Sequence, residues 1–293
     1  MDQRDRVVGD RFGQVNVLDR PLQLAQRLAV TDRIELDPLG SGSDFTPFLQ
    51  HAGIASLNLG FGGEDDSGSY HSIYDSFDHY VRFSDTTFVY GVAQAKVCGR
   101  LVLRLADADV LPFEFGALSR QIAKFTTEVK ELTAEMRDET ATTNKLIADG
   151  TLVAAADPKQ PYVVPAAKAA VPYLNFAPLE NSAEKLRASV QAWTEASKAP
   201  MPAARRAELD RLYAAVERSL TRADGLPGRP WYRHYVYAPG QYTGYGVKTF
   251  PGVREAIELR RWDDAQQQIG VLAGVLNDCA AAIDRATALL EQK

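Results

Sequence analysis

The stretch that decides the fold is residues 269–290, which read Ile269-Gly-Val-Leu-Ala-Gly-Val-Leu-Asn-Asp-Cys-Ala-Ala-Ala-Ile-Asp-Arg-Ala-Thr-Ala-Leu-Leu290. Apolar residues recur along it at alternating steps of three and four. They are Ile269, Leu272, Leu276, Cys279, Ile283, Ala286 and Leu290. A mean spacing of about 3.5 residues places these side chains in a narrow seam, which suits packing against nearly parallel helices. The pattern predicts a long helix that belongs to a bundle.

Three more amphipathic segments precede this one. One predicted helix begins after Asn181, with Glu184 placed as in a capping box, and another begins near Pro202 in a permitted first turn. The longest repeats the seam at Leu118, Ile122, Phe125, Val129, Leu132 and Met136. Four such helices predict an up-and-down bundle, interrupted by insertions over residues 150–180 and 224–252.

The first third of the chain is less regular. A short helix is expected over residues 45–51, capped by Ser43 or Asp44 and ended by a left-handed Gly53. A buried strand is expected over residues 54–59.

A largely apolar helix over about residues 85–105 should be buried. Residues 111–116 read as a junction between an N-terminal part, 1–116, of which 1–38 cannot be placed, and a helical part, 117–293. The predicted fold class is α+β, mostly α.

Composition excludes several classes of protein. The 293 residues carry a net charge of −5, which argues against a nucleic-acid partner because phosphates need a basic face. No apolar run is long enough to predict a membrane segment, no signal-peptide core is visible, and nothing indicates a compartment. Cys98 and Cys279 are too few for a disulfide scaffold, and both are expected to be buried.

The segment 68–80 is the densest in chemically useful side chains. From spacing alone, His71 is better explained as a surface or hydrogen-bonded histidine than as a metal ligand. If it were a ligand, Asp75 or Asp78 could orient the imidazole, and His71, Asp75 and His79 together form an alternative single-zinc set.

Two further segments leave alternatives open. The acidic cluster Glu64–Asp66 is either a solvated turn or a cleft wall that favours a cationic group. The aromatic, basic segment 229–239 is either an interface or a loop packed on its own bundle. No nucleophile elbow, phosphate-binding loop or His-Glu-x-x-His motif occurs in the sequence.

Seven short motifs then occur in one order. They are Leu39-Gly-Ser-Gly-Ser-Asp-Phe45, Gly53-Ile-Ala-Ser56, Tyr70-His-Ser-Ile-Tyr-Asp75, Leu111-Pro-Phe113, Leu226-Pro-Gly-Arg-Pro-Trp-Tyr-Arg-His234, Tyr237-Ala-Pro239 and Phe250-Pro-Gly252. Together they resemble the C-terminal part of the M28 zinc-peptidase family, in the group of glutamate carboxypeptidase II and the transferrin receptor. The resemblance implies that residues 1–116 are a partial peptidase domain and residues 117–293 a helical dimerisation domain.

The resemblance also implies roles for individual residues. His71 matches the final ligand of a centre of two zinc ions, whereas Tyr70, Ser43 and Tyr245 match residues that contact a peptide substrate. Ser43 replaces the family's Asn. The other zinc ligands and the catalytic Glu lie upstream of the His71 motif in the family, and the adjacent Glu-Glu pair that supplies base and ligand is not in this chain.

A carboxylate clamp for glutamate substrates is also missing. Asn58 and Gly60 stand where the family has Arg, and Gly244 stands where it has Lys. We therefore expect a fragment of a dizinc exopeptidase that is inactive alone, binds no zinc tightly and forms a homodimer. The complete enzyme would prefer neutral or basic peptides. The alternative is a stand-alone, non-catalytic dimeric binding module.

Overall fold

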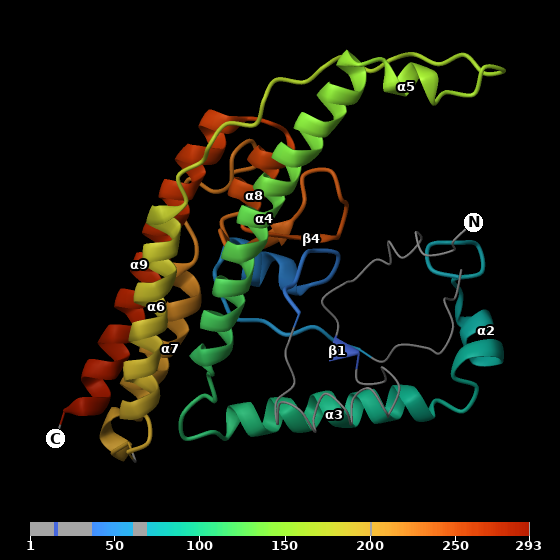
Figure 1. Ribbon diagram of the computed structural model, residues 1–293. Coiled ribbons are helices and arrows are strands. Elements are labelled where there is room, and N and C mark those ends of the chain that lie inside the picture. The colour runs from blue at the N-terminus through green and yellow to red at the C-terminus, as the bar shows by residue number, and fades with distance from the viewer. Residues whose placement is uncertain (1–14, 17–36, 61–68, 200, 293) are drawn as a thin grey trace.

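The computed structural model describes residues 15–16, 37–60, 69–199 and 201–292 (Figure 1). Most of the stretch 1–38 and the acidic cluster Glu64–Asp66 lie outside this part. Within it, no helix is both long and apolar enough to cross a membrane.

Four helices form the bundle that the apolar spacing predicts. They are α4 (Phe115–Ala148), α6 (Ala177–Ala196), α7 (Arg206–Ser219) and α9 (Trp262–Glu291). Successive helices alternate in direction, as Figure 1 shows, so the up-and-down arrangement is confirmed. A short 3-10 turn, η3 (Ala203–Arg205), leads into α7 after Pro202.

The start of α6 corrects one expectation. The helix begins at Ala177 rather than after Asn181, and Pro178 lies in its first turn, where a proline costs no hydrogen bond. The side chain of Asn175 accepts a hydrogen bond from the Ala177 amide at 3.1 Å, which satisfies one of the exposed donors at this end.

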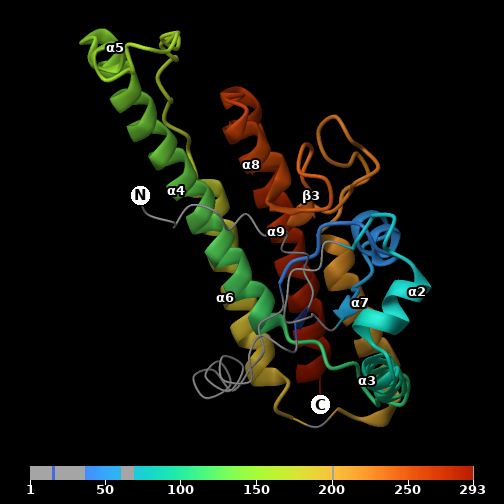
Figure 2. The same ribbon diagram turned by 90° about the vertical axis from the view of Figure 1, so that its right-hand side faces the viewer.

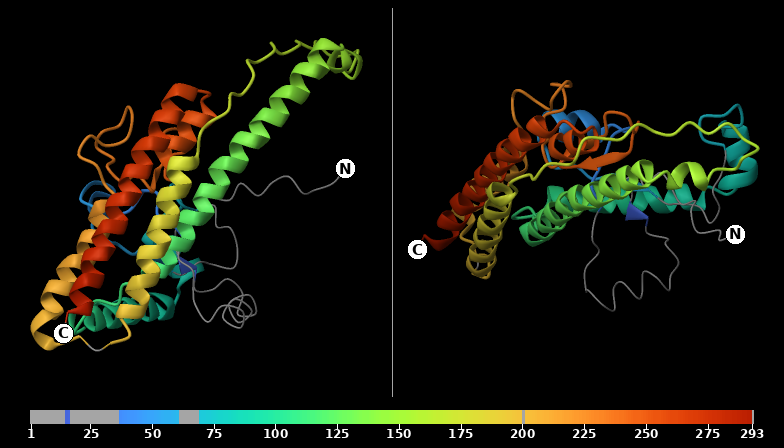
Figure 3. Two further views of the ribbon diagram at one scale, coloured as in Figure 1. Left: turned by 60° about the vertical axis from the view of Figure 1, so that its left-hand side comes forward. Right: turned by 45° about the horizontal axis from the view of Figure 1, so that its top comes forward.

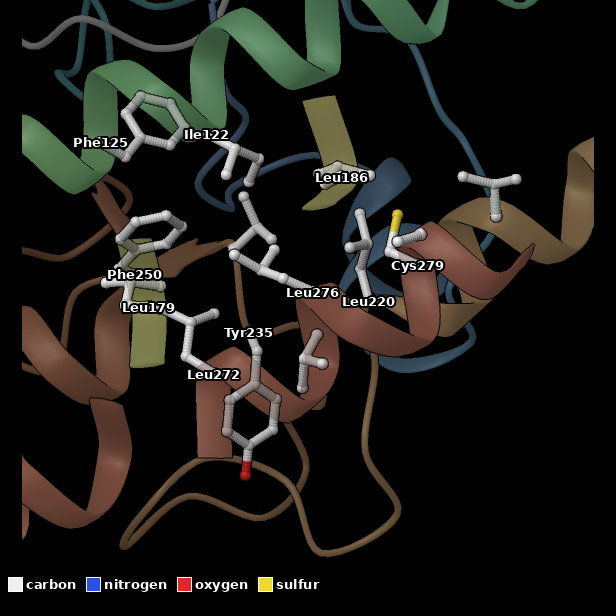
Figure 4. Packing of buried hydrophobic residues seen from close by; sticks show 14 of the residues in the cluster. Ile122, Phe125, Leu179, Leu186, Leu220, Tyr235, Phe250, Leu272, Leu276 and Cys279 are labelled. Atoms are coloured by element: carbon white, nitrogen blue, oxygen red, sulfur yellow. The ribbon is translucent and has the colours of Figure 1, made fainter. Parts of the chain in front are cut away.

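The seam of α9 forms the centre of the hydrophobic core (Figure 4). Its residues from Ile269 to Ala286 are buried, and only Leu290 at the end is partly exposed. The facing residues come from all three other helices and from the second insertion. They include Ile122, Phe125, Leu179, Leu186, Leu209, Leu220 and Phe250. The cluster also includes Phe115, with Val110 and Phe113 packed against it, so the junction 111–116 is fixed to the bundle.

The first insertion forms an arm beyond the bundle. The end of α4 projects past the other helices together with α5 (Thr151–Ala154), as all views in Figures 1 to 3 show. After a turn at residues 157–160, the chain returns without helix or strand over residues 161–176. Arg137, Asn144 and Arg260 fasten this return by hydrogen bonds to main-chain carbonyl oxygens of Pro172, Lys168 and Ala169.

The second insertion packs back on the bundle. It contains the antiparallel hairpin of β3 (Tyr237–Pro239) and β4 (Val247–Thr249), followed by α8 (Pro251–Glu258). Tyr235 and Val236 are buried in the bundle core, whereas Trp231 and Tyr242 remain exposed. Of the two alternatives for the segment 229–239, its inner residues therefore follow the second: they pack on the protein's own bundle.

The N-terminal part carries little regular structure. A π-helical turn, η1 (Pro47–His51), forms where a short helix is expected, and Gly53 follows it with φ of 63°. The expected side-chain cap is absent; instead the Ser43 carbonyl oxygen accepts from the Thr46 amide. The expected buried strand over 54–59 is wrong in extent and in burial. Among the described residues of this stretch only β2 (Leu59–Gly60) pairs, in parallel with β1 (Val15–Asn16), and both Ile54 and Leu57 are exposed.

Helix α3 (Val89–Ala106) departs most from expectation. It follows α2 (Phe77–His79) and η2 (Tyr80–Ser84), and Figure 1 shows that it runs crosswise to the bundle helices, away from them at the end where α4 begins. It contains no buried residue. Cys98, also expected to be buried, is partly exposed. The helix was expected inside a core because it is apolar on most sides, but in the described part nothing covers those sides.

Candidate functional site

The loop at residues 39–43 contacts Tyr245 across about 200 residues of sequence. The Ser41 main-chain N–H donates a hydrogen bond to the Tyr245 carbonyl oxygen at 3.1 Å. A Cβ atom on Gly40 would lie 2.0 Å from that same oxygen. A Cβ on Gly42, whose φ is 97°, would lie 2.8 Å from Tyr245 Cγ. Both glycines are therefore required by the close approach.

Two of the residues that the resemblance assigns to substrate contact thus share one region. Ser43 is exposed at the end of this loop, and Tyr245 lies against the glycines that precede it. Tyr245 is 42% exposed, so part of the residue is accessible to a ligand. We call the surface formed by Gly40–Ser43 and Tyr245 the wall.

A small apolar cluster lies beneath the wall. Leu39, Phe45 and Leu49 are buried together, and Tyr237 of β3 packs against them. Tyr237 also packs against the core of the bundle. This side chain therefore packs against the small N-terminal cluster and against the core of the bundle at the same time.

The hydroxyl end of Tyr237 reaches a buried polar cluster. Tyr237 donates to Glu217 Oε1 at 3.0 Å, and the ring of His234 stacks on that of Tyr237 with centroids 4.2 Å apart. His234 Nδ1 accepts from the main-chain amides of Val236 and Tyr237, so Nε2 carries the proton and donates to Glu217 at 3.0 Å. Burial, and then the Glu217 carboxylate, raises the pKa of Tyr237 well above its ordinary value.

Tyr70 and His71 lie elsewhere. Their rings stack on each other with centroids 3.8 Å apart, and both side chains are exposed. The backbone of His71 has φ of 57°, and its N–H donates to Asp75 Oδ2 at 3.1 Å. Figure 1 shows α2, which follows this segment, separated from the hairpin of β3 and β4. The structure therefore does not bring His71 to the wall.

The described residues do not by themselves fit a zinc centre. Among them, no three His, Cys, Asp or Glu side chains form a group that could hold a metal ion. The alternative set of His71, Asp75 and His79 is not such a group. Asp75 instead accepts from the His71 main chain, and the His79 ring contacts Phe83. A catalytic zinc needs three protein ligands and a position for water.

Beside Tyr245 lies a shallow hollow of about 360 Å³, lined in part by Gly246, Lys248 and Arg254. The two cations are held by carboxylates: Arg254 pairs with Glu128 and Lys248 with Glu258, each at 2.7 Å. These pairs reduce the positive potential that the hollow could offer to an acidic ligand.

Sequence reasoning did not identify the residues that support the wall. His234 and Tyr237 lie within two of the seven motifs but were given no role there, and Gln50 and Glu217 lie in none of them. One weak signal was present: Gln50 is a polar residue within the short helix that the sequence predicts beside the glycine-rich loop. Burying such a side chain costs free energy unless its polar atoms form hydrogen bonds.

The comparisons with known proteins place the chain in a class. Residues 174–284 match the model of the transferrin receptor-like dimerisation domain, which covers α6 to most of α9. Residues 174–284 therefore belong to a domain of this class.

Longer matches extend the comparison to the N-terminal part. The chain is 32% identical over 237 residues to "Probable glutamate carboxypeptidase LAMP1" of Arabidopsis thaliana, covering 78% of this chain and 29% of the relative. It is 30% identical over 255 residues to "Probable glutamate carboxypeptidase" of Arthroderma benhamiae, covering 84% and 31%. It is 26% identical over 270 residues to "Aminopeptidase NAALADL1" of Rattus norvegicus, covering 86% and 31%.

The chain spans about 30% of the length of the curated relatives it matches. It corresponds to the C-terminal part of an M28-type peptidase, with the transferrin receptor-like dimerisation domain that this group carries.

Proposed function

We propose that this chain is the C-terminal part of a dizinc, M28-type exopeptidase and that it forms a homodimer through residues 117–293. In the complete enzyme it supplies one zinc ligand, His71, and the substrate contacts of Tyr70, Ser43 and Tyr245. Zinc supplies an activated water in that enzyme when it is bound. Alone, this chain associates but does not hydrolyse peptides.

The contact between Ser41 and Tyr245 is the observation that carries this proposal. It brings two segments that match substrate-contacting positions into one surface, although about 200 residues separate them. The close packing of Gly40 and Gly42 on Tyr245 holds that surface in a fixed shape. A preformed surface of this kind suits binding of an extended peptide.

The exposed face of α3 supports the proposal that the peptidase part is incomplete. Val102 is 63% exposed and Leu103 is 70% exposed, although both are large apolar side chains. Ile73 and Phe77, near His71, are 89% and 73% exposed. Monomeric proteins rarely leave a large apolar surface without a partner. The preceding part of a peptidase domain would cover it.

The substrate preference belongs to this proposal as well. Asn58, Gly60 and Gly244 lack the cationic side chains that would clamp an acidic residue. Lys248 and Arg254 beside the wall are engaged by carboxylates. We therefore propose neutral or basic peptides as substrates of the complete enzyme.

Sedimentation and metal analysis on one sample test the first part of the proposal. We expect a dimer that contains no stoichiometric zinc and releases no amino acid from neutral, basic or acidic dipeptides. A zinc-loaded monomer would contradict both the association and the metal assignment. Hydrolysis by the isolated chain that is abolished by a chelator and by His71→Ala would contradict the proposed inactivity.

Supplying the upstream peptidase segment tests the second part. When the chain is produced joined to the preceding segment of a relative, we expect zinc-dependent hydrolysis that His71→Ala abolishes. His79→Ala, in the same segment, is the matched control and should retain activity. Equal loss in both variants would show that the segment is needed only for folding.

A second candidate function is a stand-alone dimeric binding module. The observation that favours it is the core of the bundle, which draws on all four helices and the second insertion. A stable dimer that gains no hydrolytic activity when joined to an upstream peptidase segment would favour this candidate.

A further inference from the structure

Gln50 is a fully buried polar side chain beneath the wall. Its relative exposure is 0%, and it lies at the end of η1 beside the apolar Leu49. The side-chain amide nitrogen donates to two main-chain carbonyl oxygens, those of Leu39 at 3.0 Å and Gly40 at 3.1 Å. The amide group therefore grips the first two residues of the loop that carries Ser43.

The main chain of Gln50 holds the other side of the same region. Its carbonyl oxygen accepts from the Arg233 amide at 2.7 Å. The next residue, His51, stacks on Trp231 and places Nδ1 2.8 Å from the Trp231 carbonyl oxygen. One residue thus links the loop at Gly40 to the segment that leads into β3.

Burial alone does not explain a glutamine at this position. Gln50 Oε1 is buried and has no hydrogen-bond partner among the described residues, which is a cost that an apolar side chain of similar size would avoid. The residue offsets that cost only through the two hydrogen bonds its amide nitrogen donates. Those bonds act on the shape of the loop, because their acceptors are backbone oxygens of Leu39 and Gly40.

Towards Tyr245 the loop is held by the hydrogen bond from Ser41 and by the close packing of Gly40 and Gly42. Both contacts depend on the position of the loop backbone, because neither glycine has a side chain. Holding the carbonyl oxygens of Leu39 and Gly40 therefore holds the wall.

We infer that Gln50 is a positioning residue for substrate binding: it holds Gly40–Ser43 against Tyr245 without touching the substrate itself. This inference rests on the proposed function for the role of the wall, but the positioning can be measured in the chain alone.

Hydrogen exchange measured by mass spectrometry on the full chain tests the inference. Gln50→Met keeps the volume and the apolar packing but removes the donor. We expect exchange in a peptide covering residues 40–45 to become about tenfold faster, with α9 as protected as in the wild type. Gln267→Met, an exposed glutamine on α9, is the control and should change neither region. If Gln50 only fills space, Gln50→Met should leave the exchange rate of residues 40–45 unchanged.

A second variant provides an independent check. Gln50→Leu is apolar and of similar size and also removes the donating amide, so it should give the same local loss of protection. Unchanged exchange at residues 40–45 in both variants would overturn the inference. A loss of protection that extends through α9 in both variants would also overturn it, because Gln50 would then stabilise the whole fold.

Activity in the joined enzyme separates the inference from the proposed function. There, Gln50→Met should raise KM with little change in kcat, because the wall contacts the substrate but carries none of the groups that take part in the reaction. If the joined enzyme hydrolyses no peptide, the proposed function fails, while the exchange result still decides whether Gln50 positions the loop.

Discussion

The Cα atom of Gly42 lies against the ring of Tyr245, so closely that a Cβ atom there would be 2.8 Å from Cγ of the tyrosine. The backbone of Gly42 is also in a conformation, with φ of 97°, that other residues rarely adopt. Two independent physical reasons thus require glycine at this position.

Gly42→Ala should therefore destabilise the protein by about 1–3 kcal/mol, as measured by denaturant unfolding. Adding Tyr245→Ala should recover part of this loss, because the steric conflict disappears while the backbone strain remains. Gly99→Ala is the matched control: a Cβ at Gly99 meets nothing within 4 Å, and α3 favours alanine over glycine. A Gly42→Ala protein as stable as the wild type would show that the contact is absent in solution.

Removing the charge of Glu255 should expose the cost of an unpaired buried cation. Glu255 accepts from Arg229 at 2.7 and 2.8 Å and from the Gln241 amide at 2.7 Å, and both charged side chains are almost fully buried. Glu255→Gln leaves the Arg229 charge without a counterion, so we expect a loss of about 3 kcal/mol in unfolding free energy. Glu184→Gln, which disrupts the exposed pair with Arg187, should leave the unfolding midpoint unchanged. Equal effects would contradict the burial of the Arg229 pair.

Alkaline pH should weaken the fold through Cys279. Burial raises the pKa of the Cys279 thiol from 9.0 to about 12, opposed by a hydrogen bond with Ser219 and reinforced by Glu217. Between these values the unfolded chain releases a proton that the folded chain keeps. The contribution of this thiol to the free energy of unfolding is therefore fully present below pH 9. It falls as pH rises, by at most about 1.4 kcal/mol per pH unit.

Cys279→Ala should make this decline shallower between pH 9 and 10, in denaturant titrations at fixed ionic strength. Cys98→Ala, at a partly exposed thiol, should keep the wild-type slope. Above pH 10 both proteins should lose stability further, because the folded state also holds the proton of Tyr237. Identical slopes for the two variants would mean that the Cys279 thiol does not resist ionisation.

Shortening one leucine in the bundle and one in α3 should show how differently the two regions contribute to the free energy of unfolding. Leu276 is fully buried in the core of α9, and Leu276→Ala should cost about 2–5 kcal/mol. Leu103 is 70% exposed on α3, and Leu103→Ala should change the unfolding free energy by less than about 0.5 kcal/mol. A large cost at Leu103 in the isolated chain would show that α3 is covered, for example by a second copy.

The bundle was predictable because its signal is local. The seams that include Ile122 and Ile269 specify which face of each helix is buried, and both residues are buried as expected. The failure at α3 has a physical cause: apolar composition reports how much surface a helix needs to bury, but not whether the same chain provides the cover. The start of α6 was misplaced because Pro178 was not recognised as a first-turn proline.

The candidate site was only partly predictable for a related reason. The motifs around Ser43 and Tyr245 could be recognised, but nothing local indicates that Gly42 and Tyr245 touch. The support from Tyr237 depends on partners far away in the sequence, and that from Gln50 depends on main-chain oxygens of an irregular loop, which no pattern of spacing encodes. Such contacts become visible only in three dimensions.

The contact between His51 and Trp231 joins residues 180 positions apart, and this separation affects how the protein is made. At a translation rate of roughly 5–20 residues per second, residues 39–51 leave the ribosome about 10 to 40 seconds before the segment they pack against. During that interval Leu39, Phe45 and Leu49 have no partner from the helical part. Synthesis of this protein therefore includes a waiting period in which a chaperone could protect these side chains.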